Sequence, residues 1–398
     1  MEWSNEKLGD YCEVIAGQSP EGKYYNDKAE GLPFYQGKKE FGSRYIGEPK
    51  KWTTKVTKKA RAGDILMSVR APVGPINFST QDICIGRGLA AIRPIKELNQ
   101  DFLFYYLLSK QEEITGNEGA VFASINKAQI EALSFSYVSL DEQKRIVAIL
   151  DQAFAEIDQA RANAQQKLNN ARELFESYLQ QIFSQRGEGW VSGTLSELCQ
   201  IKPPKKEAKE LLNDNDLVSF VPMNAMGIKK KDLNLDQNRE LKDVTGSYTY
   251  FAENDVLLAK ITPCFENGKL GLARGLTNGV GFGSSEYIVF RCGSLLDPDF
   301  LYYYLSQQEF IDKGKKLMSG AVGHKRVSKD FIAEHKIFYP SLEQQLHFVA
   351  KIEKLALNVS RIEQIYQNKL DNLDQLKKSI LQKAFTGELT KENKGVAA

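Results

Sequence analysis

The sequence of 398 residues lacks the features that indicate a disulfide scaffold, a structural zinc site or a membrane protein. Its five cysteines are scattered, odd in number and never paired as Cys-x-x-Cys, so buried free thiols are the expected state. No apolar run approaches the ~20 residues that a membrane helix needs, and the amino terminus lacks the charged-then-apolar pattern of a signal peptide. We therefore expect a cytoplasmic protein without a membrane segment.

Motifs for catalysis are also missing from the sequence. None of the three histidines lies at the His-x-x-x-His spacing of a zinc site, and no Gly-x-Ser-x-Gly element occurs. Residues 267–270 resemble the end of a phosphate loop, but Pro263 stands in place of its first glycine and Leu270 in place of its Ser or Thr. Residues 281–283 form a glycine pair too short for a dinucleotide or methyl-donor site. We expect no catalytic residue, no cofactor and no metal.

The sequence does contain an internal repeat. Residues 101–107 (DFLFYYL) return as residues 299–305 (DFLYYYL). Each copy also has a Trp, a Leu and a Cys at one spacing, then Gly-Ala-Val, then a Ser-Leu-acidic step; these are Trp3, Leu8, Cys12, 119–121 and 139–143 in one copy and Trp190, Leu195, Cys199, 320–322 and 341–345 in the other. A repeat of roughly 190 to 200 residues lets each copy bury its own core.

Each copy divides into a strand-rich front and a helical back. Residues 62–70 and 253–261 each read as a turn that leads into a β-strand and then a Pro/Gly loop, and further short strands are expected around 84–93 and 287–291. Two α+β domains are therefore expected.

Asp101 and Asp299 begin the repeated aromatic segments. Pro298 and Asp299 resemble half of a nuclease signature, but no acidic-x-Lys pair follows at a useful distance, and Asp101 has no proline before it. Because aspartate is a favoured N-cap, we expect both residues to cap the aromatic helices. The tyrosines of these helices are expected to pack in cores and interfaces; they are Tyr105, Tyr106, Tyr303 and Tyr304.

The back of each copy predicts one long helix. Residues 141–185 contain neither Pro nor Gly, and apolar or small residues recur at steps of three, four and seven. The stripe of the first copy runs through Leu150, Ile157, Ala164, Leu168, Ala171, Phe175, Tyr178 and Ile182, and that of the second through Ile352, Leu355, Val359, Ile362, Tyr366, Leu370, Leu373, Leu376 and Ile380. Two such stripes are expected to pack on each other as a coiled coil.

Connectivity predicts the direction of the second helix. Only residues 184–189 separate the first helix from Trp190, so the second front is expected at the far end of that helix. The second helix can then pack along the first only by running back. We expect an antiparallel coil with a pseudo-twofold axis, a front at each end and a length of ~65 Å, or about two turns of B-DNA.

Basic residues cluster in the fronts although the net charge is only +2. Residues 38–61 contain nine Lys and Arg residues and only two glutamates, with three aromatic residues interleaved. Further basic residues gather at 202–209, 229–231 and 325–326. Such clusters can neutralise phosphates. A solvated lysine face is the alternative interpretation.

The combination closely resembles the specificity subunit of type I restriction-modification enzymes, over nearly the whole chain. The resemblance rests on the two fronts with Gly-Asp-Ile-Leu or Asn-Asp-Val-Leu, then Asp-Phe-Leu-x-Tyr-Tyr-Leu, Ser-Leu-x-x-Gln and a long helix that ends near residues 385–389. It implies target recognition domains at 1–140 and 186–340, long spacer helices at 141–185 and 341–387, and a tail at 388–398. It also implies a non-catalytic subunit that recognises a bipartite, asymmetric site in double-stranded DNA and recruits two methyltransferase (M) and two restriction (R) subunits.

Side chains that contact base edges must reach a DNA groove from loops, while Lys and Arg hold the phosphates. The candidates for phosphate contacts in the first front are Lys38, Lys39, Arg44, Lys55 and Lys58, those for base contacts are Arg70 and Arg87, and those of the second front are Lys205, Lys230, Arg239, Lys260 and Arg326. For any one of them, a surface salt bridge is an equally good interpretation.

Two other functions are alternatives to a DNA specificity module. A fused DNA methyltransferase needs an Asn/Asp-Pro-Pro-Tyr/Phe motif, but the only paired prolines, Pro203 and Pro204, lie between lysines. A structural coiled-coil scaffold explains the helices and leaves two large, diverged fronts unexplained. A specificity module for DNA accounts for both.

Overall fold

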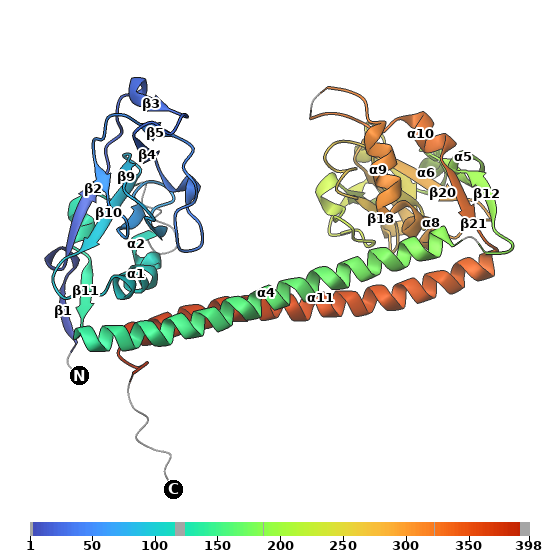
Figure 1. Cartoon of the computed structure of the whole chain (residues 1–398). Helices are drawn as coiled ribbons and strands as arrows, with labels where there is room; N and C mark the ends of the chain where they lie inside the picture. Colours follow the sequence, from blue (N-terminus) through green and yellow to red (C-terminus); the bar gives the residue numbers. More distant parts are fainter. Residues whose placement is uncertain (1–2, 116–123, 186, 322, 391–398) are drawn as a thin grey trace, which may run out of the picture. The chain divides into compact units, whose positions relative to one another are not determined.

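The computed structural model describes residues 3–115, 124–185, 187–321 and 323–390 (Figure 1). The chain forms two compact units, which we call the first unit (residues 1–165 and 368–398) and the second unit (166–367). The Gly-Ala-Val segment 119–121, Val322 and residues 391–398 of the predicted tail lie outside the described residues.

The front of the first unit is built from short strands and helices. In chain order they are β1 (Ser4–Lys7), η1 (Leu8–Asp10), β2 (Cys12–Ala16), η2 (Gly22–Tyr24), β3 (Tyr25–Asn26), β4 (Leu32–Tyr35), η3 (Lys38–Glu40), β5 (Trp52–Thr53), β6 (Lys59–Ala60), β7 (Ile65–Ser68), β8 (Ile76–Phe78), β9 (Ile83–Ile85), β10 (Leu89–Pro94), α1 (Gln100–Ser109), α2 (Gln111–Thr115), α3 (Lys127–Glu131) and β11 (Ser134–Tyr137). They form sheets of order β1-β11, β2-β10-β7-β8 and β3-β5-β4-β9-β6.

The front of the second unit repeats two of these three sheets. Its elements are β12 (Val191–Thr194), α5 (Leu195–Leu198), β13 (Cys199–Ile201), α6 (Lys206–Leu211), β14 (Leu217–Val221), η4 (Met223–Ala225), β15 (Asn238–Glu240), α7 (Leu241–Val244), β16 (Thr249–Ala252), β17 (Val256–Ala259), β18 (Leu270–Leu272), η5 (Thr277–Gly279), β19 (Val280–Gly283), β20 (Tyr287–Cys292), α8 (Pro298–Leu305), α9 (Gln308–Lys316), α10 (Lys329–Glu334) and β21 (Lys336–Tyr339). Sheets β12-β21 and β13-β20-β17-β18 match β1-β11 and β2-β10-β7-β8, whereas β15-β14-β19-β16 has its own order.

The predicted strands and long helices are present. The strands expected within 62–70 and 253–261 are β7 and β17, and the long helices are α4 (Leu140–Ser184) and α11 (Leu342–Phe385). Ion pairs join the two helices in each unit: Asp158 to Lys377 and Arg161 to Asp374 in the first, and Arg172 to Glu363 in the second. Residue numbers fall along α11 as they rise along α4, which confirms the antiparallel packing of the two helices.

The predicted stripe of α11 is wrong at two positions. Ile362 and Leu376 are exposed, at 37% and 47%, while Ile352, Val359 and Leu370 are buried as expected. The reason is that the positions facing α4 drift onto Glu363 and Lys377, which hold the ion pairs just described. An α-helix has 3.6 residues per turn, so a stripe counted in strict sevens moves off the contact line.

Aromatic residues at the ends of the long helices complete the two cores. Phe385 of α11 packs against Phe102 and Tyr106 of α1, with ring centroids 5.3 and 5.2 Å apart. Phe183 of α4 packs in the same way against Phe300 and Tyr304 of α8, at 5.1 and 5.4 Å. The tyrosines Tyr105, Tyr106 and Tyr303 are buried, as predicted.

The predicted caps of the aromatic helices are wrong by two residues. Asn99 caps α1 by accepting a hydrogen bond from the amide of Phe102, and Asp297 caps α8 through the amide of Phe300. Asp101 and Asp299 instead lie in the first turns of these helices, where each binds an arginine, Arg44 or Arg274. A carboxylate in the first turn is also favourable, because the amino end of a helix carries partial positive charge.

Candidate nucleic-acid interface

Two buried arrangements hold the same frame in both fronts. Arg93 of β10 donates to the buried Asp64 before β7, and Arg291 of β20 donates to Asp255 before β17. A second arrangement centres on the glutamine of Ser-Leu-x-x-Gln. Gln345 is fully buried, accepts from the amide of Asp297 at 2.9 Å and donates to two backbone carbonyls, and Gln143 does the same with Asn99.

This frame presents one pair of loops in each unit. The segment after β7 pairs with the chain near Ser124, through a bridge from Arg70 and a hydrogen bond from the amide of Ile125 to Val69. The segment after β17 pairs in the same way with the chain near Arg326, through the amide of Val327 and the carbonyl of Lys260 at 2.9 Å. The predicted residues Arg70, Lys260 and Arg326 therefore lie on equivalent loops of the two fronts.

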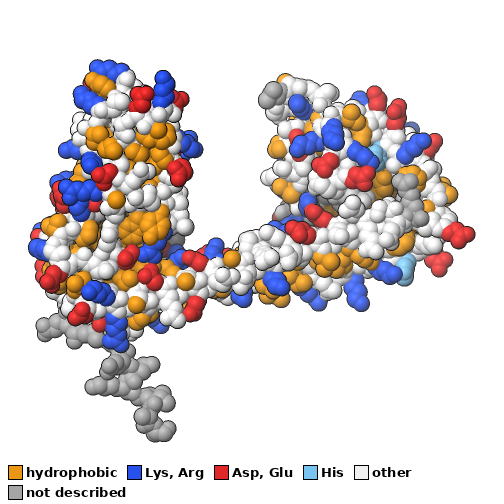
Figure 2. Space-filling model, in the orientation of Figure 1, with side chains coloured by type: hydrophobic (Ala, Val, Ile, Leu, Met, Phe, Trp, Pro, Cys, Tyr) orange, Lys and Arg blue, Asp and Glu red, His pale blue; other side chains and the backbone are white. Residues whose placement is uncertain are grey.

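The tip of the first unit, which carries η2, β3 and β5, combines lysines with aromatic rings. Lys23 and Lys55 lie over the ring of Tyr24 at 5.1 and 5.0 Å, and Lys51 lies over Tyr25 at 5.9 Å. Lys and Arg side chains gather visibly at this tip (Figure 2). Such ammonium–ring contacts hold Lys51 and Lys55 in place without neutralising their charge, whereas Lys23 also pairs with Glu21 at 2.7 Å.

Five of the predicted residues of the first front keep their charged groups available. Among the residues that the structure describes, none forms an ion pair or a hydrogen bond with the charged groups of Lys38, Lys39, Lys58, Arg70 or Arg87; the side chains of Ser68 and Ser19 contact only the backbone of Arg70 and Arg87. Lys59, by contrast, is paired with Asp82 at 2.6 Å. These five side chains are free to contact DNA, and their role as DNA contacts stays a prediction.

The guanidinium group of Arg44 binds side chains of the first unit. It donates to Asp101 at 2.6 Å, to the hydroxyl of Tyr105 at 2.9 Å and to Asp151 at 3.1 Å. Burial alone would lower its pKa, but Tyr105 and the carboxylates raise the pKa above its ordinary value. This geometry favours a structural role for Arg44 over the predicted phosphate contact.

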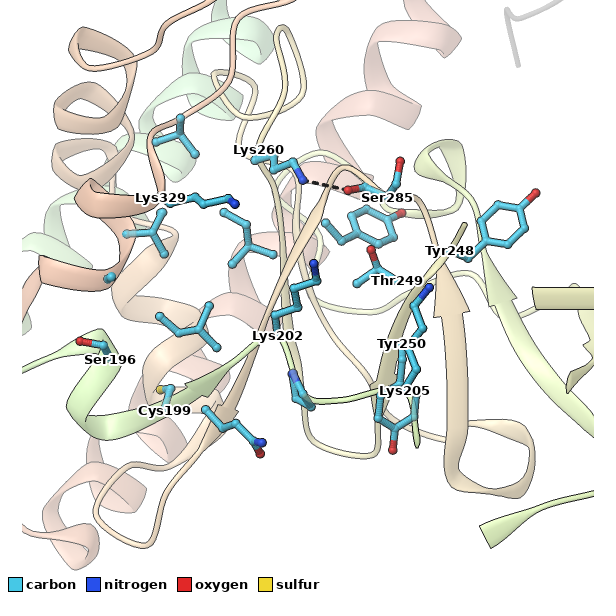
Figure 3. Close-up of a pocket in the computed structure, with 18 of the residues that line it drawn as sticks. Ser196, Cys199, Lys202, Lys205, Tyr248, Thr249, Tyr250, Lys260, Ser285 and Lys329 are labelled. Atoms are coloured by element: carbon cyan, nitrogen blue, oxygen red, sulfur yellow. Dashed lines mark hydrogen bonds between the residues drawn. The ribbon is translucent and has the colours of Figure 1, made fainter. Parts of the chain in front are cut away.

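Two predicted lysines of the second front meet at a cavity of about 650 Å³. Lys205 and Lys260 line it together with Lys202 and Lys329 (Figure 3). The Nζ atom of Lys260 donates to the carbonyl of Ser285 at 2.8 Å, and that of Lys205 donates to the carbonyl of Gly246 at 2.6 Å. No local pattern singles out Lys329, because the cavity brings together segments that lie far apart in the chain.

The other predicted residues of the second front have three different surroundings. Arg326 is held by both carboxylate oxygens of Glu286, at 2.9 and 2.8 Å. Arg239 lies over the ring of Phe220 at 3.5 Å and donates to the hydroxyl of Tyr248, which also lines the cavity. Lys230 is exposed, whereas its neighbours Lys229 and Lys231 are paired with Glu176 and Glu353.

Membrane and metal features are not found in the described part of the chain. No helix there is long and apolar enough to cross a membrane. No group of three or more His, Cys, Asp or Glu residues there could hold a metal ion.

Comparison with known proteins gives consistent matches. The family model described as type I restriction modification DNA specificity domain matches residues 1–170 and again 187–372. The type I restriction enzyme EcoEI specificity subunit of Escherichia coli is 33% identical over 195 residues, which are 49% of this chain and 32% of that protein. The putative MjaX specificity subunit of Methanocaldococcus jannaschii is 45% identical over 149 residues, 37% of this chain and 34% of that protein.

These matches span about a third of the length of each of the two relatives. A solved structure from work on complex assembly and conformational transition of the type I R-M system covers 97% of this chain and 98% of its own, with a TM-score of 0.75 at 19% identity. It has the same fold.

Proposed function

The chain belongs to the family of type I restriction modification DNA specificity proteins, and on this premise we propose that it recognises a bipartite, asymmetric DNA site as the specificity subunit of a restriction-modification complex. The observation that carries the proposal is the pairing of a common frame with different surfaces. Both units hold the same buried ion pair and the same buried glutamine, but the sheet β3-β5-β4-β9-β6 of the first unit and the sheet β15-β14-β19-β16 of the second differ in strand order. Different surfaces on one frame suit two different half-sites.

The basic groups support double-stranded DNA as the partner. The lysine-rich tip and the available Arg70 and Arg87 serve the first half-site, and Lys205, Lys230 and Lys260 serve the second. Lysines and arginines supply most phosphate contacts, whereas arginines next to turns can reach base edges. Arg239 and Arg326 contribute positive charge beside the cavity and the loop after β17.

Recruitment of partners is assigned to the long helices. Six large apolar side chains are exposed on the parts of α4 and α11 that belong to the second unit; they are Leu174, Leu342, Leu346, Leu357, Ile362 and Ile365, with exposed fractions of 59, 43, 56, 54, 37 and 62%. Exposed apolar groups of this kind mark protein contacts. We assign them to one of two methyltransferase subunits, which supply the methyl donor site, while two ATP-driven restriction subunits join the complex. The chain itself performs no chemistry, binds no cofactor and works in the cytoplasm, where the DNA lies.

The proposal is tested by reconstitution. The full chain is purified alone and with the methyltransferase subunit of the same organism, and modified bases are mapped on a DNA library. We expect modification of one bipartite, asymmetric sequence with both proteins present and none with the chain alone. Robust methyl transfer by the isolated chain, or modification without sequence preference, would contradict the proposal.

A further inference from the structure

The cavity of the second front carries positive charge that no lining residue compensates. Four lysines line it, and no Asp or Glu is among its described lining residues. Glu286 is the acidic group nearest to Lys260, at 3.9 Å, and both of its oxygens already accept from Arg326. Within the described residues, Lys202 and Lys329 have no ion pair.

The four lysines act on one another across this space. Burial, followed by the charge of Lys202, lowers the pKa of Lys205. Burial also lowers the pKa of Lys260, and the charges of Lys202, Arg326 and Lys329 add to this effect against the opposing effect of Glu286. The charge of Lys202 therefore lowers the pKa of both Lys205 and Lys260. An anion placed among them would relieve this repulsion.

The backbone at Lys202 is held in an unusual conformation. Its φ is +60°, in the left-handed region that a residue with a side chain seldom adopts. Its amide donates to the carbonyl of Val289 at 2.8 Å, and Pro203 follows it. Such conformations gather at sites that bind ligands, where the surrounding structure enforces them.

The remaining walls of the cavity suit a nucleoside. Its apolar lining residues, here called the apolar wall, include Ile201, Pro203, Ile288 and Ile332, and hydroxyl groups are supplied by Ser247, Thr249 and Ser285. Figure 3 shows Lys202 and Lys205, from the segment between β13 and α6, together with Lys260, which follows β17. The volume of about 650 Å³ lies in the range of sites for small molecules, well above the space that one phosphate fills.

We propose that this cavity binds a nucleotide, with its phosphate between Lys202, Lys260 and Lys329 and its base against the apolar wall. The nucleotide has two possible sources, a free nucleotide or one nucleotide of bound DNA. The site goes beyond the recognition of a DNA sequence, because a free nucleotide would bind here whether or not the chain selects a DNA site. Lysine amines suit phosphate through charge-assisted hydrogen bonds.

The experiment uses the full chain and three ligands: ADP, inorganic phosphate and duplex DNA. Calorimetry measures ADP and phosphate binding, and fluorescence anisotropy measures DNA binding, for the natural chain and for the double variant Lys202→Ala with Lys329→Ala. Both lysines are exposed, so the variant should fold, which thermal unfolding checks. The matched control is Lys316→Ala, an exposed lysine of α9 outside the cavity.

ADP is expected to bind more tightly than phosphate, and the double variant to weaken ADP binding about tenfold or more while Lys316→Ala leaves it unchanged. That result assigns the site to a free nucleotide. If ADP does not bind but the double variant loses DNA affinity about tenfold relative to the control, the nucleotide comes from DNA and the proposal stands. Equal binding of ADP and DNA by the variant and the control overturns the site, and DNA selection by both proteins would show that the proposed function survives that failure.

Discussion

Arg291 donates two parallel hydrogen bonds to the buried carboxylate of Asp255, from Nε to Oδ1 at 2.8 Å and from a terminal nitrogen to Oδ2 at 2.7 Å. The side chain of Asp255 has no exposed surface, and burial raises its pKa against the opposing effect of Arg291. Arg93 and Asp64 form the same pair in the first unit, at 2.9 and 2.7 Å. In each unit the pair joins two neighbouring strands of the four-stranded sheet whose order recurs in both units.

Arg291→Met is expected to destabilise the second unit by about 3 to 5 kcal/mol, because it leaves the buried carboxylate of Asp255 without its ionic partner and with only the amide of Ala252 as hydrogen-bond donor. Chemical denaturation of the full chain measures the loss. Lys313→Met is the control: it breaks the exposed pair with Glu309 and should cost under about 1 kcal/mol. Equal small losses in both variants would show that the buried pair is dispensable.

Because of His335, the free energy of unfolding should fall in acid. This ring packs against Phe310 and Phe331, and burial, with the charge of Lys313, lowers its pKa to about 4. The unfolded chain takes up the proton below the ordinary pKa of about 6.5. The neutral histidine therefore contributes stability above pH 6.5, and this contribution, on the order of 2 kcal/mol, is lost as the pH falls toward 4.

His335→Phe keeps the ring contacts and removes the proton site, so its free energy of unfolding should change less between pH 6.5 and 4 than that of the natural chain. His324→Phe, at an exposed position, should retain the full pH dependence. Identical pH profiles for the natural chain and His335→Phe would contradict the assignment.

Lys55 and Lys58 should contribute to DNA affinity without contributing to sequence preference. Replacing each by Ala is expected to weaken binding to all sequences and to lower the slope of log affinity against log salt by about 0.9 per lysine. Lys59→Ala serves as the neighbour control, because Asp82 already pairs with that lysine. If the slope changed as much for Lys59→Ala as for Lys58→Ala, the proposed DNA contact of Lys58 would be contradicted.

Exchange of residues 1–140 for the front of a related subunit should change one half-site and leave the other intact. The donor front must supply an Asn or Asp at the position of Asn99, because its side chain caps α1 by accepting from the amide of Phe102, while its backbone amide donates to Gln143 of α4. Mapping of modified bases on genomic DNA gives the result. A change of both half-sites would mean that the two surfaces do not act separately.

A fragment that ends near residue 186 should form an antiparallel dimer. It keeps Phe102 and Tyr106 but loses Phe385, and its own Phe183, at the matching place of α4, can fill the vacated contact in a second copy. The dimer should bind methyltransferase subunits and direct modification to a palindrome. Analytical ultracentrifugation measures the association, with Phe183→Ala as the weakened variant; a monomeric fragment would show that the two helix ends are not interchangeable.

Much of the fold could be predicted because the sequence carries it twice. The repeated motif Ser-Leu-x-x-Gln marks the start of each long helix, and the structure explains it: Gln143 and Gln345 satisfy three backbone groups from a fully buried position. The caps were misplaced because the motif contains Asp101 and Asp299, while the helices begin one residue earlier, at Gln100 and Pro298.

The candidate site was harder to predict, because charge counted along the chain does not show distant partners. Arg44 lies in a basic run, yet Asp101 and Asp151 reach it from other elements. Lys202 and Lys329 are 127 positions apart in the sequence and line one cavity. Tertiary contacts of this kind leave no local pattern.

The shared register of α4 and α11 constrains how such a chain can change length during evolution. A turn inserted in α4 between Arg161 and Arg172 would leave Asp374 or Glu363 opposite the wrong residue unless α11 gained a turn at the facing position. We therefore expect a single insertion to separate one of these ion pairs and a paired insertion to keep both. Natural variants of this chain that differ in the length of one long helix should then differ in the length of the other.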